Sequence, residues 1–314
     1  MTRRRLAGWA AGTALLGLAM MTLGAFVRAS ESGLGCPDWP ACHGQLVAGG
    51  HHALIEEAHR WLATILVVAV VGLALIVFRD YRHERRVIRP VAWMLALLAL
   101  QVILGGVTVL LRNVAWTVVA HYGAAALLVW SITLVAVRLA FPADGRAPRD
   151  SFSRLIGWFV VLSFGLLLAG STVANTDSHT SCGRGFPLCN ESLFPALNHH
   201  VVINLTHRIW APVMLVFALW AVSRSRRDRA DSPAIVRAAT TVATLFFIEA
   251  AIGIDVVVFG QNRAVEVLHS SIASLTWLAL MALLSLTWTM PHRDTRIEGQ
   301  ARARRTSRLL PRSG

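Results

Sequence analysis

The 314-residue chain is too apolar for an ordinary soluble protein, because 55% of its residues are hydrophobic and only 15% are charged. Its mean hydropathy is +0.56. The formal net charge of +13 does not indicate a nucleic-acid-binding protein, since the basic residues, all of them arginine, are concentrated in a few short segments. Composition therefore predicts an all-α integral membrane protein, because no segment alternates as a β-barrel strand would.

Eight apolar stretches have the roughly 20-residue length that a bilayer requires. In chain order they cover residues 6–27, 54–78, 91–111, 115–141, 155–174, 203–222, 238–259 and 265–290. Each is expected to form one transmembrane helix. The first stretch follows a run of arginines, as in a signal peptide, but it is longer than the apolar part of a typical signal peptide and is interpreted as a helix of the bundle.

The arginines also predict the orientation of the chain. Five segments contain 24 of the 30, and they fall on one side of the membrane if the eight helices alternate in direction. These segments are residues 3–5, 79–89, 138–154, 224–237 and 293–312. The positive-inside rule then predicts a multi-pass protein of the cell membrane with both termini cytoplasmic and the cysteine-containing loops extracellular. The basic C-terminal tail (291–314) is expected to be disordered, with contact to anionic membrane lipid as the alternative.

Four histidines recur after a constant interval of 148 residues, which predicts an internal repeat. The matched pairs are His51 and His199, His52 and His200, His59 and His207, and His121 and His269. The repeat predicts eight helices as two parallel four-helix bundles, related by a pseudo-two-fold axis along the membrane normal. The predicted parts are an N-terminal half (1–142), a cytoplasmic linker (143–154), a C-terminal half (155–290) and the tail (291–314).

Four cysteines form two close pairs in the two longest arginine-poor loops, Cys36 with Cys42 and Cys182 with Cys189. An extracellular location favours disulfides, so two local bridges are expected. Each bridge would constrain its loop, and a redox-active thiol pair is the alternative. Zinc binding together with nearby histidines is less favoured, because the spacing of zinc-binding cysteines is missing.

The strongest candidates for chemistry are His59, His121, His207 and His269. Each is expected one or two turns inside a helix that enters from the extracellular side, so the four imidazoles should lie at a similar depth. An ionisable group at that depth should face the bundle interior and have a partner. Haem is the favoured partner, because two imidazoles from facing helices can ligate one iron. Hydrogen-bonded packing is the alternative.

The two halves differ beside these histidines. Glu56 precedes His59 by three residues, whereas Asn204 stands at the equivalent position before His207. A carboxyl group one turn from an iron ligand, partly removed from water, holds its proton more tightly and is suited to proton transfer. Support of a neighbouring histidine or arginine is the equally weighted alternative. Glu57 is expected to be solvated.

Several other polar residues have open roles. Arg60 and Arg208 directly follow two of the histidines and either neutralise haem propionates or extend to the membrane surface. Glu249 and Asp255 belong to a proton route or, as the favoured interpretation, form interhelical hydrogen bonds. The sequence does not assign a role to Glu266.

Together these motifs resemble the haem A synthase family. The resemblance covers residues 6–290 and depends on the Glu-x-x-His-Arg motif from Glu56 to Arg60, on His207 with Arg208, on the single histidines His121 and His269, and on the two cysteine pairs. It implies an oxidoreductase that converts the C8 methyl group of haem O to a formyl group by successive hydroxylations, giving haem A for cytochrome oxidase.

The resemblance also implies a role for each half. The C-terminal half would hold a haem b cofactor through His207 and His269. The N-terminal half would hold the substrate through His59 and His121, with Arg60 in the substrate site and Glu56 assisting catalysis. The implied partners are an unidentified electron donor and, among other assembly factors of cytochrome oxidase, an enzyme that supplies haem O. The Cys36–Cys42 pair resembles the pair that the family associates with activity.

Two other classes of protein fit parts of the pattern. A di-haem b-type electron-transfer cytochrome would need the same four histidines but would leave its porphyrins unaltered. A membrane thiol oxidoreductase would depend on the cysteines and not on the histidines.

Overall fold

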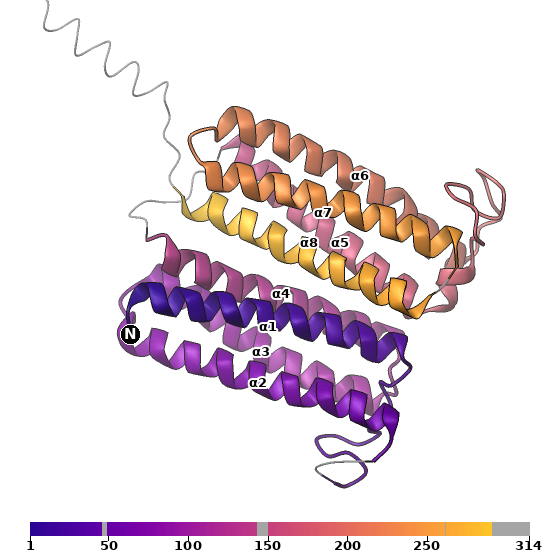
Figure 1. Cartoon of the computed structure of the whole chain (residues 1–314), viewed down its shortest axis with the longest axis horizontal. Coiled ribbons are helices and arrows are strands. Elements are labelled where there is room, and N and C mark those ends of the chain that lie inside the picture. Colours follow the sequence, from indigo (N-terminus) through magenta and orange to yellow (C-terminus); the bar gives the residue numbers. More distant parts are fainter. Residues whose placement is uncertain (46–48, 143–149, 261, 291–314) are drawn as a thin grey trace, which may run out of the picture.

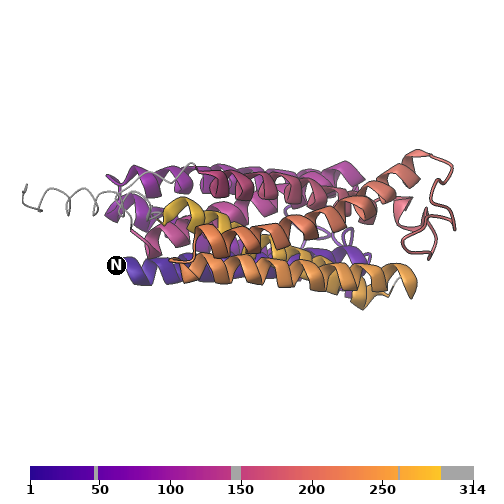
Figure 2. The ribbon, with the colours of Figure 1, turned by 90° about the horizontal axis from the view of Figure 1, so that it is seen from above.

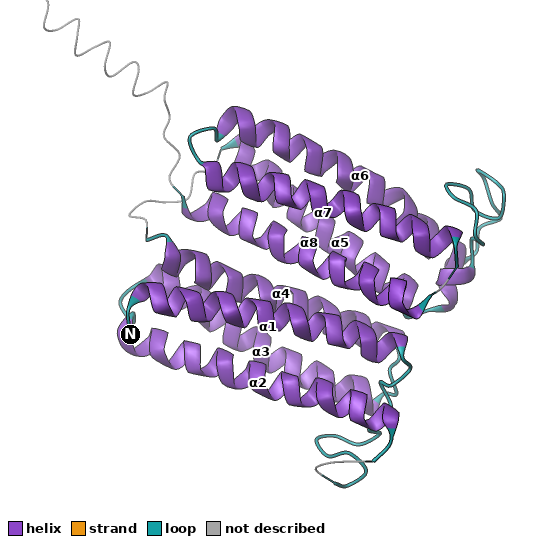
Figure 3. Cartoon of the chain, viewed as in Figure 1, coloured by secondary structure: helices purple, strands orange, loops and turns teal. Residues whose placement is uncertain are grey.

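The computed structural model describes residues 1–45, 49–142, 150–260 and 262–290, and within these ranges the protein is built from helices and loops. Figure 3 shows the helices in purple, with no strand among the described residues. The long helices are α1 (Arg3–Ala29), α2 (His51–Asp80), α3 (Arg85–Leu110), α4 (Ala115–Ala140), α5 (Ser151–Ala174), α6 (His199–Asp228), α7 (Pro233–Val258) and α8 (Arg263–Thr289). A short 3₁₀ helix, η1 (Asp177–Thr180), lies between α5 and α6.

All eight long helices are long and apolar enough to cross a membrane, which confirms the prediction of a multi-pass, all-α membrane protein. Their outward-facing side chains agree with this conclusion, because large apolar residues such as Val68, Trp93 and Phe247 are about two-thirds exposed. In water such a surface would be unfavourable, whereas lipid tails solvate it.

The helices extend further than the apolar stretches. For example, α2 begins at His51 and α6 at His199, a few residues before the predicted stretches at 54 and 203. Polar caps define several starts: the side chain of Asp150 accepts a hydrogen bond from the backbone N–H of Ser153 in α5, and that of Asn198 accepts one from the N–H of Val201 in α6. The predicted tail (291–314) and most of the predicted linker (143–149) lie outside the described residues.

The helices form two groups of four that lie side by side, α1–α4 and α5–α8 (Figure 1). Viewed at 90° to this direction, the long helices run along a common axis (Figure 2). Each group has its own apolar core: Val70, Met94 and Ile132 belong to the first, and Phe159, Met214 and Leu280 to the second. The contact surface between the groups is formed mainly by α1, α4, α5 and α8. The pseudo-two-fold relation between the groups stays a prediction.

Polar contacts join the two groups across this surface. The indole N–H of Trp277 in α8 donates to the carbonyl of Ala126 in α4 at 2.8 Å, and the hydroxyl groups of Tyr122 and Ser274 lie 3.1 Å apart. Near the cysteine-loop end, the guanidinium of Arg28 in α1 lies 3.3 Å from the carboxylate of Glu266 in α8 and also donates to the carbonyl of Ala174. These contacts fix the register of α8 against the first group.

Loss of the Arg28 contacts should destabilise the protein. We expect Arg28→Ala to lower the free energy of unfolding by about 2 kcal/mol, because it removes a mostly buried ion pair and a hydrogen bond, and Glu266→Gln to lower it by about 1 kcal/mol. Unfolding in detergent as a function of denaturant measures both, with Arg4→Ala on the exposed side of α1 as the control. If the double variant lost the sum of the two single effects, the ion pair would contribute nothing to stability.

Candidate functional site

The four repeated histidines lie at the same end of their helices. His59 and His207 are each eight residues after the first residue of α2 and α6, and His121 and His269 are each six residues after the first residue of α4 and α8. This is the end at which the two cysteine loops lie (Figure 1). The structure therefore places two imidazoles in each group of helices, one or two turns from these loops.

Each of these imidazole rings has a buried nitrogen without a hydrogen-bond partner among the described residues. The unpaired atom is Nδ1 in all four cases, although each side chain as a whole is only half-buried. His59 and His121 are close enough to interact electrostatically, and so are His207 and His269. Buried polar groups are normally satisfied, so four equivalent exceptions need an explanation. Two imidazoles in an apolar surrounding are a donor set that fits haem iron.

Gln101 lies beside His121 in the first group, a contact that the sequence analysis did not predict. Its side-chain nitrogen lies 3.2 Å from Nε2 of His121, and its Oε1 is buried without a partner. Glu249 stands at the equivalent position in α7, where its carbonyl lies near His269. The 148-residue interval relates position 101 to position 249 and could have pointed to Gln101. It could not show that Gln101 contacts His121.

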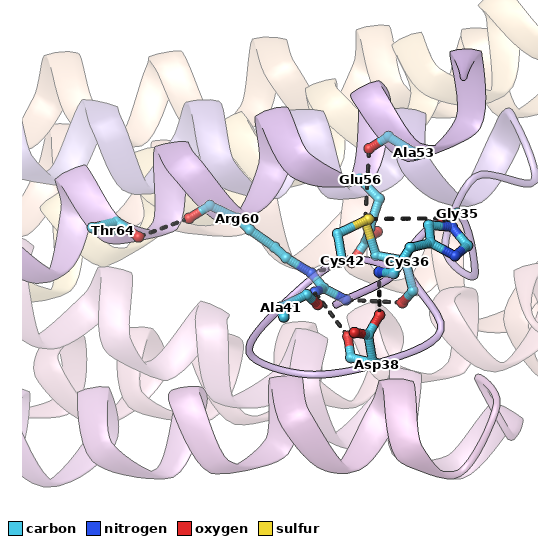
Figure 4. Close-up of polar contacts among 10 residues, drawn as sticks. Gly35, Cys36, Asp38, Ala41, Cys42, Ala53, Glu56, Arg60 and Thr64 are labelled. Atoms are coloured by element: carbon cyan, nitrogen blue, oxygen red, sulfur yellow. Dashed lines mark hydrogen bonds and ion pairs between the residues drawn. A yellow bond between two sulfur atoms is a disulfide. The ribbon is translucent and has the colours of Figure 1, made fainter. Parts of the chain in front are cut away.

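Arg60 connects α2 to the first cysteine loop, as Figure 4 shows. Its guanidinium donates to the carbonyls of Asp38, Ala41 and Cys36 at 2.8 to 3.0 Å. Its Nε donates to Oε1 of Glu56 at 3.1 Å, and only 5% of Glu56 is exposed. The sequence anticipated an arginine partner for Glu56 as one alternative, but neither interpretation of Arg60 included its binding to the loop.

Arg208 makes the equivalent contacts in the second group, with one difference. It donates to the carbonyls of Gly185 and Leu188 at 2.8 and 3.1 Å, but its Nε is buried without a partner. Asn204, which replaces the glutamate, instead donates to the carbonyl of Ser178 at 2.6 Å. The carboxylate beside the arginine is therefore specific to the first group.

Both predicted disulfides are present, Cys36–Cys42 and Cys182–Cys189. In the first loop, the carboxylate of Asp38 accepts hydrogen bonds from the backbone N–H groups of Gly44 and His43 at 2.8 and 2.7 Å. The hydrogen bond from Gly44 is the main cause that holds the pKa of Asp38 below its ordinary value. Among the described residues, no cluster of three or more His, Cys, Asp or Glu side chains suits zinc or another metal ion.

One expectation near the site was wrong. Glu57 was expected to be solvated, but only 6% of it is exposed. The first turns of α2 are not free in solvent, because the preceding loop packs on them: the hydroxyl of Ser32 lies 2.9 Å from Nδ1 of His52, for example. Ala53, Glu56 and Glu57 are therefore buried in these turns, although Leu54 stays exposed.

The helices, the pair of imidazoles in each group and the two disulfide-bonded loops define the class: a multi-pass, all-α membrane protein with two matched histidine sites. The profile of the COX15-CtaA family, described as cytochrome oxidase assembly protein, matches residues 7–58 and 53–281. The chain belongs to this family.

Curated relatives carry a more specific name. The chain is 28% identical over 277 residues to "Heme A synthase" of Alkalihalophilus pseudofirmus, an alignment that covers 84% of this chain and 91% of the relative. It is 28% identical to the protein of that name from Symbiobacterium thermophilum, with 88% and 93% covered, and 27% identical to that from Shouchella clausii, with 87% and 94% covered.

Proposed function

We propose that this protein is a haem A synthase, an oxidoreductase that converts the C8 methyl group of haem O to a formyl group. The observation that carries the proposal is the asymmetry between two otherwise matched sites: both groups of helices have a histidine pair and a loop-binding arginine, but only the first has a carboxylate, Glu56, on that arginine. Family membership and the names of the relatives support the same function.

The asymmetry suggests a division of labour between the groups. His207 and His269 would hold a resident haem b, and His59 and His121 would hold the haem substrate. When bound, the resident haem supplies electron transfer. The chain itself would contribute the imidazoles that hold each haem, an apolar surrounding that excludes water, and a buried carboxyl group one turn from His59.

Glu56 is placed to move protons at the substrate site. Oxidation of a methyl group to a formyl group releases protons, and a nearly buried carboxyl group can accept or return them without bulk water. Arg60 would hold Glu56 in place and, through the carbonyls of Asp38, Ala41 and Cys36, would keep the first cysteine loop over the site. This positioning role of Arg60 in the substrate site differs from both roles that the sequence left open, which were neutralisation of haem propionates and extension to the membrane surface.

Orientation and boundaries complete the proposal. The arginine-rich helix ends would be cytoplasmic, which places both disulfide loops and the four histidines near the extracellular side of the cell membrane. Residues 1–142 would form the substrate half and 155–290 the cofactor half. A donor of electrons and an enzyme that makes haem O would be the functional partners.

The test is to co-express the chain with a haem O-forming enzyme and to analyse the extracted haems by mass spectrometry. A haem with a formyl group in place of the methyl group is expected, and it should be absent when the chain is omitted. Retention of two unaltered b-type haems without any formylated product would instead identify a di-haem electron-transfer cytochrome. Activity that persisted without the histidines and disappeared without the cysteines would identify a thiol oxidoreductase.

A further inference from the structure

Each of the four histidines packs the edge of its ring against a glycine of the preceding helix. A Cβ atom built on the glycine would lie 2.9 to 3.3 Å from Cε1 of the histidine. The pairs are Gly24 with His59, Gly105 with His121, Gly170 with His207, and Gly253 with His269. The contact therefore occurs four times, between α1 and α2, α3 and α4, α5 and α6, and α7 and α8.

The recurrence indicates a requirement rather than chance packing. The protein has 23 glycines, and many of those in helices have other surroundings. An added Cβ would meet nothing within 4 Å at Gly8, Gly12 or Gly157, and would meet tryptophan side chains at Gly72 and Gly165. Each histidine of the two pairs nevertheless has its own glycine.

The distances show that an added methyl group at these positions would press on the imidazole ring. Carbon atoms in contact prefer separations of about 3.5 to 4.0 Å, so a methyl group at Gly170, 2.9 Å from Cε1 of His207, would force a shift. The glycine is fixed in a helix backbone, and the ring is the movable partner. The ring would therefore turn or withdraw, and its nitrogens would move with it.

We propose that Gly24, Gly105, Gly170 and Gly253 are positioning residues that set the depth and the plane of the imidazole rings. Each glycine has no side chain, which leaves room for the ring edge that carries Cε1 and Nδ1. This edge can therefore lie between the two helices. The ring plane is then fixed by the backbone of a neighbouring helix and not only by the histidine's own rotamer. This inference rests on the proposed function in so far as the rings ligate haem.

The test uses matched glycine-to-alanine substitutions on the same helix. Gly170→Ala in α5 should disturb His207, whereas Gly157→Ala in α5 has open space for its methyl group and is the control. Both substitutions make the same small change in helix propensity, so their difference reports the contact with the ring. Gly24→Ala and Gly12→Ala form an equivalent pair in α1 for His59.

Three readouts on the purified protein are independent of turnover: the haem content, the midpoint potential, and the g-values of the oxidised haem in electron paramagnetic resonance, which depend on the angle between the imidazole planes. We expect Gly170→Ala to weaken retention of the resident haem by roughly tenfold or more, as loss of support for a metal ligand does, and to shift the g-values of the haem that remains. Gly157→Ala should match the parent protein in all three.

The result that would overturn the proposal is a Gly170→Ala protein with the haem content, potential and g-values of Gly157→Ala. If Gly170→Ala folds poorly, Gly253→Ala provides the same measurement on His269, the other proposed ligand of the resident haem, against the same control. A lower unfolding temperature with unchanged g-values would also contradict the proposal, because it would show a packing role alone. A shifted spectrum of Gly170→Ala, together with a parent protein that makes no formylated haem, would support the positioning role and reject the proposed synthase activity.

Discussion

Replacing His207 with Ala is expected to remove the resident haem, with a decrease in bound haem of at least about tenfold, and to abolish formation of haem A. The reason is that His207 would be one of only two imidazoles holding the resident haem. His59→Ala should give the opposite combination: the resident haem stays, and only the conversion of haem O is lost. The haem content of the purified protein and the extracted haems measure the two effects separately.

A control for these variants is available in the same helix. His200 also belongs to the repeat, but its Nδ1 lies 3.1 Å from the hydroxyl of Ser178, so it already has a partner. His200→Ala should keep both the resident haem and the activity. Equal loss of haem from His59→Ala and His207→Ala would contradict the proposed division between a substrate half and a cofactor half.

The second large effect concerns Glu56. We expect Glu56→Gln to lower the turnover of haem O by about 10²-fold or more while the resident haem remains bound, because glutamine can still accept the hydrogen bond from Arg60 but cannot exchange a proton. Glu56→Asp should retain part of the activity. Single-turnover conversion of haem O, followed by analysis of the extracted haems, is the measurement.

This comparison distinguishes proton transfer from structural support. If Glu56→Gln kept full turnover while Glu56→Ala lost it, the carboxylate would serve only to hold Arg60 and the loop. Glu31→Gln is a suitable control, since Glu31 is an exposed carboxylate in the loop between α1 and α2. It should behave as the parent protein.

The helices could be predicted from the sequence because the bilayer imposes a simple physical constraint. An apolar run of about 20 residues has one structural solution in lipid, and all eight runs became helices. The ends of the helices were harder to predict. Helices α2 and α6 begin before the apolar runs, because polar residues such as His51 and His199 can be helical outside the lipid.

The contacts of the candidate site were harder to predict. The 148-residue interval identified the histidines, since a duplicated site repeats its ligands at equal spacing. It could not show that Arg60 binds the carbonyls of Asp38 and Ala41, because those oxygens belong to a loop whose shape depends on its own turns and disulfide. The glycine beside each histidine was equally hidden, since helix register, and not spacing along the chain, brings the two together.

The ion pair between Arg28 and Glu266 has a consequence for biogenesis. Its two members belong to the first and the last helix, so the ribosome releases Arg28 to the membrane long before its acceptor has been translated. The same holds for the hydrogen bond to the carbonyl of Ala126, because its donor, the indole of Trp277, is also translated late. The first four helices therefore enter the membrane before these two contacts can form. The contacts are completed only after α8 has been inserted.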